Sequence, residues 1–294
     1  MDFPRDDEHL RRLIRLAIAE DLGPGDVTTE SLVSEEARAT ANVVARESGV
    51  IAGLPLIAMI LDELTARATV TLRHTDGDGV SSGDVVAVIH GPAGALLTAE
   101  RTVLNFLRHL SGVATLTRTY VDAVAGTHAR IYDTRKTTPG LRVLEKYAVR
   151  VGGGENHRMG LHDAVLVKDN HLALLAQSGE SLVDAVKRIR RKHPDIPIEI
   201  EADTEAHVRR AVEADADIIL LDNMTPDRLY AAVKLVKQLR PEKRPVLEAS
   251  GGITLETIRA VALCGVDRIS VGAITHSARS FDLAVDFETE GGGA

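Results

Sequence analysis

Apolar residues recur with two different spacings along the chain, and the spacing changes near residue 115. In the first part, segments 8–20 and 98–110 have apolar residues three or four positions apart, which predicts amphipathic helices. Three strand-like runs lie between them, at 39–46, 69–74 and 84–90. Strands that cluster in this way, instead of alternating with helices, predict a small α+β domain.

From residue 129 onward, apolar strand candidates alternate with amphipathic helices. The strands are expected at 129–132, 164–167, 197–200, 217–221, 244–247 and 268–271, and the helices at 141–150, 180–191, 204–214, 226–240 and 255–264. Apolar strands separated by helices predict a parallel sheet. Such units could close a (β/α) barrel smaller than the usual eight. A doubly wound open sheet is the competing arrangement, although no dinucleotide-binding glycine motif follows the first strand.

Polar residues follow each of these strands. They are Asp133–Lys136, Lys168–His171, the pair Glu199 and Glu201, Asp222–Asn223, Glu248–Gly252, and Gly272 with His276. In a parallel barrel these strand ends converge on one face, where such folds carry out chemistry. One charged residue after a strand is ordinarily a solvated loop residue. Six successive strands with both signs of charge predict an active site.

The composition argues against several classes of partner. The 294 residues include 35 basic and 43 acidic ones, a net charge of −8, which disfavours nucleic acid or an anionic membrane. The single cysteine, Cys264, cannot form an intrachain disulfide and fits a reducing compartment. The longest apolar run, 50–61, is too short to span a bilayer, and the acidic N-terminus lacks a secretion signal. We therefore expect a cytoplasmic protein.

Cations and carboxylates form separate groups at the strand ends. The cations are Arg135, Lys136, His157, Arg158 and Lys168, and the carboxylates are Glu201 and Asp222. In an acidic protein, basic groups gathered at one mouth predict an anionic small molecule. Paired carboxylates that face phosphate typically hold Mg²⁺, which prefers oxygen ligands. An ion pair with the nearby cations is the alternative interpretation of Glu201 and Asp222.

Glycine-containing loops follow the last two strands of the pattern. They are Ser250-Gly251-Gly252 and Gly272-Ala273-Ile274-Thr275. Backbone N–H groups in such loops bind phosphate, and barrels frequently place a phosphate site in the last two strand–helix loops. A glycine pair alone is more often a plain turn, but two such loops in succession favour phosphate.

Longer strings of residues resemble the quinolinate phosphoribosyltransferase family (nicotinate-nucleotide pyrophosphorylase, carboxylating). They lie at 20–23, 25–29, 100–107, 133–142, 145–149, 152–158, 168–171, 221–224, 248–252 and 272–277, so the resemblance covers nearly the whole chain. It implies an α/β fold with an N-terminal α/β sandwich domain at 1–114. An incomplete (β/α) barrel of about six to seven parallel strands is expected at 115–274, followed by a C-terminal helix at 275–290 that returns to the first domain and a flexible tail at 291–294.

The resemblance also implies a reaction and its residues. Phosphoribosyl pyrophosphate and quinolinate would give nicotinate mononucleotide, pyrophosphate and CO₂ in NAD biosynthesis, with Mg²⁺ as cofactor. Quinolinate binding falls to Arg101, Thr134, Arg135, Lys136, His157, Arg158 and Lys168, and phosphoribosyl binding to Glu201, Asp222, Ser250, Gly251, Gly252, Gly272 and His276. Lys136, Lys168, Glu201 and Asp222 would be catalytic, and Glu201 and Asp222 would hold the metal. A homodimer or higher homo-oligomer is implied, in which Arg101 enters the neighbouring site.

Other functions fit parts of the pattern. Lys168 at a barrel strand end could form a Schiff base, which requires apolar surroundings, whereas Asp169, Asn170 and His171 follow it. A non-catalytic subunit that binds phosphate or a dicarboxylate would share the scaffold, as would the related protein found beside molybdate transporters. The complete set of basic residues at the expected mouth favours quinolinate over these.

Overall fold

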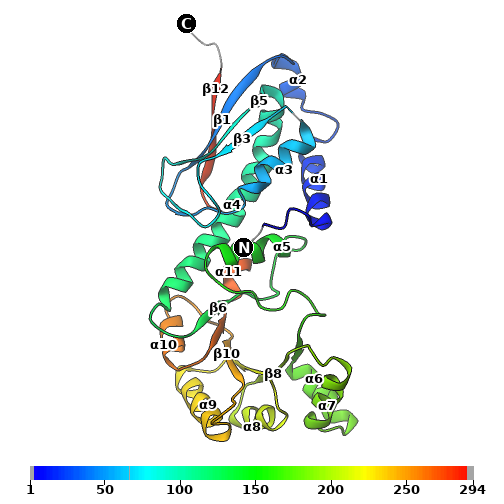
Figure 1. The fold of residues 1–294 in the computed structure, drawn as a ribbon, viewed down its shortest axis with the longest axis vertical. Coiled ribbons are helices and arrows are strands. Elements are labelled where there is room, and N and C mark those ends of the chain that lie inside the picture. Colours follow the sequence, from blue (N-terminus) through cyan, green and yellow to red (C-terminus); the bar gives the residue numbers. More distant parts are fainter. Residues whose placement is uncertain (1–2, 66, 290–294) are drawn as a thin grey trace. The chain divides into compact units, whose positions relative to one another are not determined.

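The computed structural model describes residues 3–65 and 67–289, which form two compact units. The first comprises the described parts of Met1–Arg118, Thr137–Gly153 and Thr275–Ala294, and the second comprises Thr119–Lys136 and Gly154–Ile274. The chain therefore passes between the units more often than the sequence predicts, because segment 137–153 belongs with the first unit. Figure 1 traces this path in colour.

The first unit contains a four-stranded antiparallel sheet. Its strands are β1 (Arg38–Ala45), β3 (Thr69–Leu72), β5 (Val85–Pro92) and β12 (Leu283–Thr289), in the order β12-β1-β5-β3. The short strands β2 (Gly49–Val50) and β4 (Gly79–Val80) form a separate pair. The three strands predicted in the first part of the sequence are thus confirmed as β1, β3 and β5.

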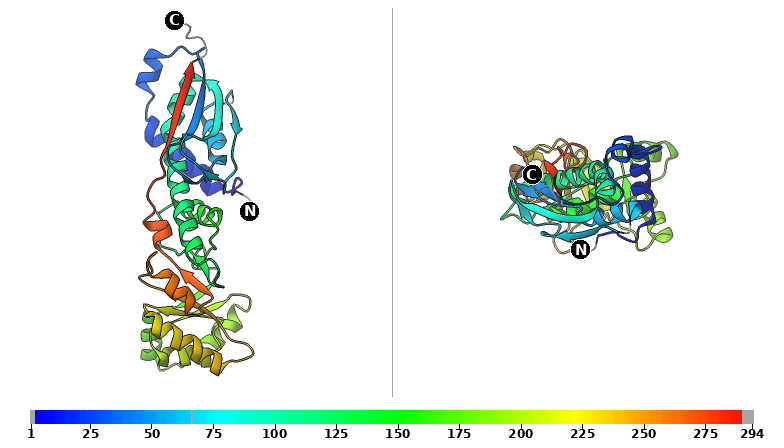
Figure 2. Two further views of the ribbon diagram at one scale, coloured as in Figure 1. Left: turned by 90° about the vertical axis from the view of Figure 1, so that its left-hand side faces the viewer. Right: turned by 90° about the horizontal axis from the view of Figure 1, so that it is seen from above.

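The predicted C-terminal helix at 275–290 is wrong. Only the short α11 (Ala273–His276) is helical, and β12 pairs antiparallel with β1, as Figure 2 shows for the red and blue strands. The alternation of Leu283, Val285 and Phe287 with smaller or acidic residues has the period of a strand. The segment does join the first unit, through this pairing. The predicted tail at 291–294 lies outside the described residues.

The first unit also contains several helices, of which α3 (Pro55–Leu64) contacts strand β3. Further helices are α1 (Glu8–Leu22), α2 (Val27–Leu32), α5 (Arg142–Val151) and α4 (Ala93–Ala123), which ends in the second unit. The sequence predicts α1, α4 and α5 but not α3, which begins with Pro55 at its first position, where the missing N–H costs nothing. Its buried face consists of Leu56, Ile57, Ile60 and Leu61.

The second unit is built on a six-stranded parallel sheet. Its strands are β6 (Arg130–Tyr132), β7 (Val165–Val167), β8 (Ile198–Ala202), β9 (Ile218–Asp222), β10 (Val246–Ser250) and β11 (Arg268–Ser270), in the order β6-β11-β10-β9-β8-β7. The helices are α6 (Asp169–Ser178), α7 (Leu182–Lys192), α8 (Glu205–Glu213), α9 (Pro226–Leu239) and α10 (Ile258–Leu263). The predicted six parallel strands are confirmed, and the sheet ends at β6 and β7 instead of closing.

Successive side chains along these strands point to opposite faces of the sheet, so apolar core residues and polar residues lie on different faces. On β8, Ile198, Ile200 and Ala202 share one face, so Glu199 and Glu201 share the other. The parallel register then places Leu220 of β9 beside both Glu201 and Glu248. One face of the sheet therefore carries a row of polar side chains. Over residues 3–65 and 67–289, none of the helices combines the length and hydropathy needed to cross a bilayer.

Candidate active site

A cavity of about 630 Å³ lies within the second unit and gathers residues from the strand ends. It brings together most of the predicted site residues: Thr134, Arg135, Lys136, His157, Arg158, Lys168, Glu201, Asp222, Ser250, Gly251 and Gly252. Leu166, Asp169, Asn170, Leu220, Asn223, Glu248 and Ser270 complete its lining. Basic and acidic groups therefore share one concave site at the carboxyl ends of parallel strands, where such folds bind ligands.

Three predicted residues do not line this cavity. Gly272 belongs to the second unit but does not line the cavity. Arg101 and His276 belong to the first unit. The Arg101 side chain is 56% exposed on α4 and lies 3.8 Å from Glu100. The roles proposed for these residues remain predictions.

Two arginines meet at the basic side of the cavity. Burial, and then the charge of Arg135, lower the pKa of the Arg158 guanidinium, while Glu199 and Asp163 act in the opposite direction. Nη1 of Arg158 also donates a hydrogen bond to the carbonyl oxygen of Ala164 at 3.1 Å, and this bond orients the Arg158 guanidinium group. Two guanidinium groups that repel each other at a pocket wall are poised for an anionic ligand.

Lys168 lies in a polar part of the same cavity, between β7 and α6. Asp169, Asn170 and Glu201 line the cavity with it, and its charge acts to lower the pKa of Glu201. A Schiff-base lysine needs apolar surroundings that favour its neutral form. These neighbours are polar or charged and not apolar, so they argue against the Schiff-base alternative.

Glu201 and Asp222 form the acidic side. Burial, then the charges of Asp222 and Asp169, raise the pKa of Glu201. Within the described part of the chain, neither Glu201 nor Asp222 forms an ion pair, and Asp222 Oδ2 accepts a hydrogen bond from Asn223 Nδ2 at 2.6 Å. Mutually repelling carboxylates with oxygen ligands to offer fit a divalent cation such as Mg²⁺ better than the ion-pair alternative.

The loop after β10 approaches β9 closely. Gly251 and Gly252 have φ values of +91° and +61°, which side chains rarely adopt. A Cβ on Gly251 would lie 2.2 Å from Oδ1 of Asn223, and the Asn223 N–H donates to the Ser250 carbonyl at 2.9 Å. Position 251 therefore requires glycine for both its backbone conformation and the lack of space, whereas at position 252 only the positive φ disfavours a side chain.

Asp133 holds the segment that carries His157. This carboxylate is fully buried and accepts from the His157 N–H at 2.8 Å and from Asn156 Nδ2 at 2.7 Å. The end of β6 thereby fixes a distant segment of the chain at the cavity wall. Asp133 belongs to one of the motifs that follow the predicted strands, but the sequence alone predicts no role for it.

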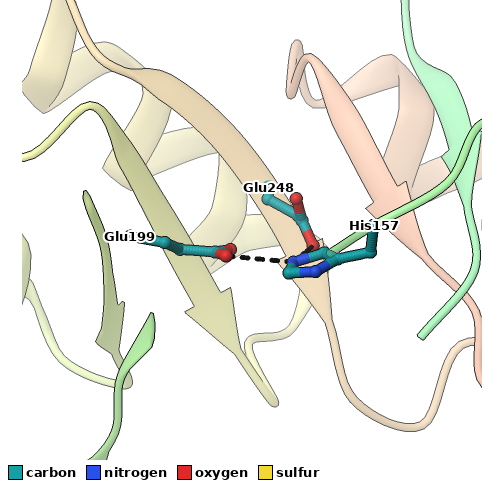
Figure 3. Close-up of side chains that lie close together, drawn as sticks. All are labelled: His157, Glu199 and Glu248. Atoms are coloured by element: carbon teal, nitrogen blue, oxygen red, sulfur yellow. Dashed lines mark ion pairs between the residues drawn. The ribbon is translucent and has the colours of Figure 1, made fainter. Parts of the chain in front are cut away.

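No site role was predicted from the sequence for two buried carboxylates, of which Glu248 lines the cavity. Glu199 Oε2 lies 2.9 Å from His157 Nε2, and Glu248 Oε1 lies 3.4 Å from the same atom (Figure 3). The Ser270 hydroxyl donates to Glu248, and burial, followed by the charge of Glu199, raises the pKa of Glu248 to about 7. The signal was present: each glutamate lies two positions before a predicted site residue on the same strand, and therefore on the same face.

Comparisons with known proteins agree with this architecture. Residues 26–111 match the model of the quinolinate phosphoribosyl transferase N-terminal domain, and residues 113–286 match that of the C-terminal domain. The chain is 43% identical to a probable nicotinate-nucleotide pyrophosphorylase (carboxylating) of Bacillus subtilis, over 94% of this chain and 93% of that protein. It is 44% identical to the corresponding enzyme of Mycobacterium leprae, over 94% and 96%.

A solved structure shows the same fold over the full length. The nicotinate-nucleotide pyrophosphorylase of Francisella tularensis superposes with a TM-score of 0.90 at 35% identity, covering 98% of both chains. The resemblance seen in the sequence motifs is thus confirmed by whole-chain similarity in sequence and structure. The chain belongs to the quinolinate phosphoribosyltransferase family.

Proposed function

We propose that this protein transfers the phosphoribosyl group of phosphoribosyl pyrophosphate to quinolinate, with decarboxylation, in NAD biosynthesis. The products are nicotinate mononucleotide, pyrophosphate and CO₂. The observation that carries the proposal is the cavity that combines Arg135, Arg158 and Lys168 with Glu201 and Asp222. Such a site can hold a dianionic ring and a phosphorylated sugar at the same time, which is the positioning that the reaction requires.

The basic side of the cavity suits quinolinate, a pyridine with two adjacent carboxylates. The forked guanidinium groups of Arg135 and Arg158 can each donate two parallel hydrogen bonds to a carboxylate. Lys136 and Lys168 act as compact charges that also reach pyrophosphate oxygens, and Thr134 contributes a hydroxyl. Arg101 of a second copy of the chain completes the basic set, so the active form is a homodimer or a higher homo-oligomer.

The acidic side suits the ribose and the metal. Glu201 and Asp222 are the residues that would hold Mg²⁺, which supplies charge neutralisation of the departing pyrophosphate. Displacement at the anomeric carbon develops positive charge on the sugar, as in glycoside chemistry, and these carboxylates stabilise it. Ser250, Gly251 and Gly252, with Gly272 and His276, hold the 5-phosphate through backbone and side-chain donors.

No protein nucleophile is required, because the pyridine nitrogen attacks the ribose itself. The ring becomes cationic when the new N–C bond forms and the C–O bond to pyrophosphate breaks. The electron pair of the C–CO₂ bond then remains on the ring carbon beside that cationic nitrogen, and a proton from solvent completes the product. The chain contributes orientation and electrostatics.

Product release tests this function. With quinolinate, phosphoribosyl pyrophosphate and Mg²⁺, purified protein should release pyrophosphate and CO₂ in equal amounts. Nicotinate, which lacks one carboxylate, should support turnover poorly, because one of the carboxylate contacts is missing. No release of CO₂ from quinolinate would refute the proposal, and a borohydride-trapped adduct on Lys168 would support the Schiff-base alternative instead.

A further inference from the structure

A second cavity adjoins the candidate active site within the second unit, and we call it the outer cavity. It has a volume of about 670 Å³. Asp169, Glu201, Asp222 and Asn223 line both cavities. The other residues that line the outer cavity come from α6, α8, α9 and the segment between β8 and α8, and they are Leu172, Ala173, Asp203, Thr204, His207, Arg210 and Arg228. Figure 1 labels these three helices.

The shared wall places the outer cavity beside the reacting groups. Glu201 and Asp222, which are proposed to hold Mg²⁺ and to face the departing pyrophosphate, line both cavities. Asn223 Nδ2 donates to Asp222 Oδ2 at 2.6 Å, so side chains and not a strand form this part of the wall. An anion released at these carboxylates therefore borders directly on the outer cavity.

Two arginines line the outer cavity and not the catalytic one. Arg228, near the start of α9, donates from Nη2 to the carbonyl oxygen of Asp203, which orients its guanidinium group. The side chain of Arg210 on α8 is exposed and forms no hydrogen bond or ion pair with the part of the chain that the structure describes. Its guanidinium N–H groups are therefore available to a ligand.

The acidic residues of the outer cavity do not neutralise these arginines. Asp203 Oδ1 lies 2.6 Å from Nδ1 of His207, and Asp169 Oδ1 accepts the backbone N–H of Asn170 at 2.7 Å. The other two acids are the proposed metal ligands. Among the described residues, neither arginine forms an ion pair with a carboxylate.

This combination suits a phosphate-rich anion that is bound together with a divalent cation. Guanidinium groups donate paired hydrogen bonds to phosphate oxygens, and carboxylates supply the oxygen ligands that Mg²⁺ prefers. Pyrophosphate, the leaving group of the proposed reaction, has this chemistry.

We propose that Arg210 and Arg228 form a second pyrophosphate subsite, which receives the leaving group after it departs from the catalytic cavity. The inference rests on the proposed function, because pyrophosphate is a product of that reaction. Lys136 and Lys168, which are proposed to contact the pyrophosphate of the intact substrate, line only the catalytic cavity. Transfer to the outer subsite separates pyrophosphate from the newly formed nucleotide and so opposes the reverse reaction.

The stoichiometry of pyrophosphate binding tests this subsite without turnover. In equilibrium dialysis of ³²P-labelled pyrophosphate against the full-length protein with Mg²⁺, the unaltered protein should bind two equivalents per chain. A double variant with Arg210→Ala and Arg228→Ala should bind one. Each single substitution should weaken binding of the second equivalent about threefold to tenfold, as for one charge-assisted contact at an exposed position.

Arg209→Ala is the matched control for these variants. Arg209 is the neighbouring residue on α8, does not line the outer cavity and lies 2.8 Å from Glu205. This variant should bind two equivalents with unchanged affinity. Quinolinate affinity, measured on each variant, shows whether the catalytic cavity is intact.

Several results would overturn the proposal. They are one equivalent on the unaltered protein, two on the double variant, or none on a double variant that still binds quinolinate, because the arginines would then belong to the catalytic subsite. If the double variant loses quinolinate affinity, the single variants decide. An unchanged affinity for the second equivalent in both single variants would overturn the proposal.

Product inhibition gives a second measurement. Pyrophosphate in the catalytic cavity competes with phosphoribosyl pyrophosphate, whereas pyrophosphate in the outer cavity is not displaced by that substrate. We therefore expect added pyrophosphate to lower kcat at saturating phosphoribosyl pyrophosphate in the unaltered protein and in Arg209→Ala, but not in the double variant. The same inhibition pattern in all three proteins would overturn the proposal. Failure of the proposed function is distinguishable, because it would appear as absent CO₂ release, whereas the dialysis experiment needs no reaction.

Discussion

The Nε2 atom of His109 lies 2.8 Å from Oε1 of Glu145, a carboxylate that is fully buried in the first unit. The other oxygen of Glu145 accepts the backbone N–H of Thr138 at 3.1 Å. Glu145 on α5 thus joins α4 to the segment that follows the basic pair Arg135–Lys136. A buried carboxyl group whose two oxygens both have hydrogen-bond partners is costly to remove, because those partners would be left unsatisfied.

We predict that Glu145→Ala lowers the free energy of unfolding by about 2–4 kcal/mol, because a donor from each of two segments loses its acceptor. Glu145→Gln should cost less, since its amide oxygen can still accept from Thr138. Urea unfolding at fixed protein concentration measures both. Equal losses in the two variants would show that the charge, and not the hydrogen-bond geometry, stabilises this junction.

Arg135→Ala should chiefly weaken quinolinate binding. Loss of a forked, charge-assisted contact is worth about 1.5–3 kcal/mol, which is roughly a tenfold to hundredfold increase in KM for quinolinate. The KM for phosphoribosyl pyrophosphate should change much less. Arg130→Ala is the matched control, because Arg130 begins β6, the strand that precedes Arg135, but its side chain is 71% exposed. Wild-type affinity for quinolinate in Arg135→Ala would mean that the pocket is assigned wrongly.

The parallel sheet and the mouth of the cavity were predictable because each strand leaves two signals in the sequence. An apolar run of suitable length marks the buried strand, and the polar residues after it mark the open end. Arg135, Lys168 and Asp222 therefore fall into one cavity although they are far apart in the chain. Predicting that these strand ends meet requires only the order of parallel strands and helices, and no knowledge of the contacts between side chains.

What the sequence could not supply depends on contacts between distant segments. Glu199 and Glu248 look like solvated acids at strand ends, and only their approach to His157 makes them a buried pair. The glycine run 152–154 has the composition of a flexible link, yet a Cβ on Gly152 would lie 2.4 Å from the Ala114 carbonyl oxygen. The helix expected at 275–290 came from the family resemblance and not from the local pattern, whose alternation has the period of a strand. The partner of that strand, β1, lies at the other end of the sequence, so only the structure shows the pairing.

Gly251→Ala should impair phosphoribosyl pyrophosphate binding and stability together. The added methyl group would collide with Asn223, and the residue would have to keep a φ of +91°. Strain of this kind costs about 1–3 kcal/mol. We expect a higher KM for phosphoribosyl pyrophosphate with a smaller change for quinolinate. Gly126→Ala, which also has a positive φ but no atom within 4 Å of its Cβ, controls for backbone strain alone. If both substitutions raise that KM equally, the loop after β10 does not form the phosphate site.

Mixed dimers test whether Arg101 works in the neighbouring site. Arg101→Ala and Glu201→Ala should each abolish most activity. In a dimer with one copy of each variant, one site regains both residues, so about half of the wild-type activity per mixed dimer is expected if the sites are shared. Tagged copies allow the mixed dimers to be isolated before assay. Mixed dimers that stay inactive would place Arg101 in its own subunit's site or in none.

The raised pKa of Glu248 predicts how stability changes with pH. Between the ordinary pKa of a glutamate and about 7, the folded protein keeps a proton on Glu248 that the unfolded chain has released. The free energy of unfolding contributed by this group therefore falls as pH rises through that window. Glu248→Gln cannot ionise, so its stability relative to wild type should improve steadily from about pH 5 to about pH 8. Urea unfolding at several pH values, at constant protein concentration, measures the difference. Glu242→Gln, at an exposed position, should show no such trend. A difference between Glu248→Gln and wild type that is independent of pH would show that Glu248 is ionised throughout the range.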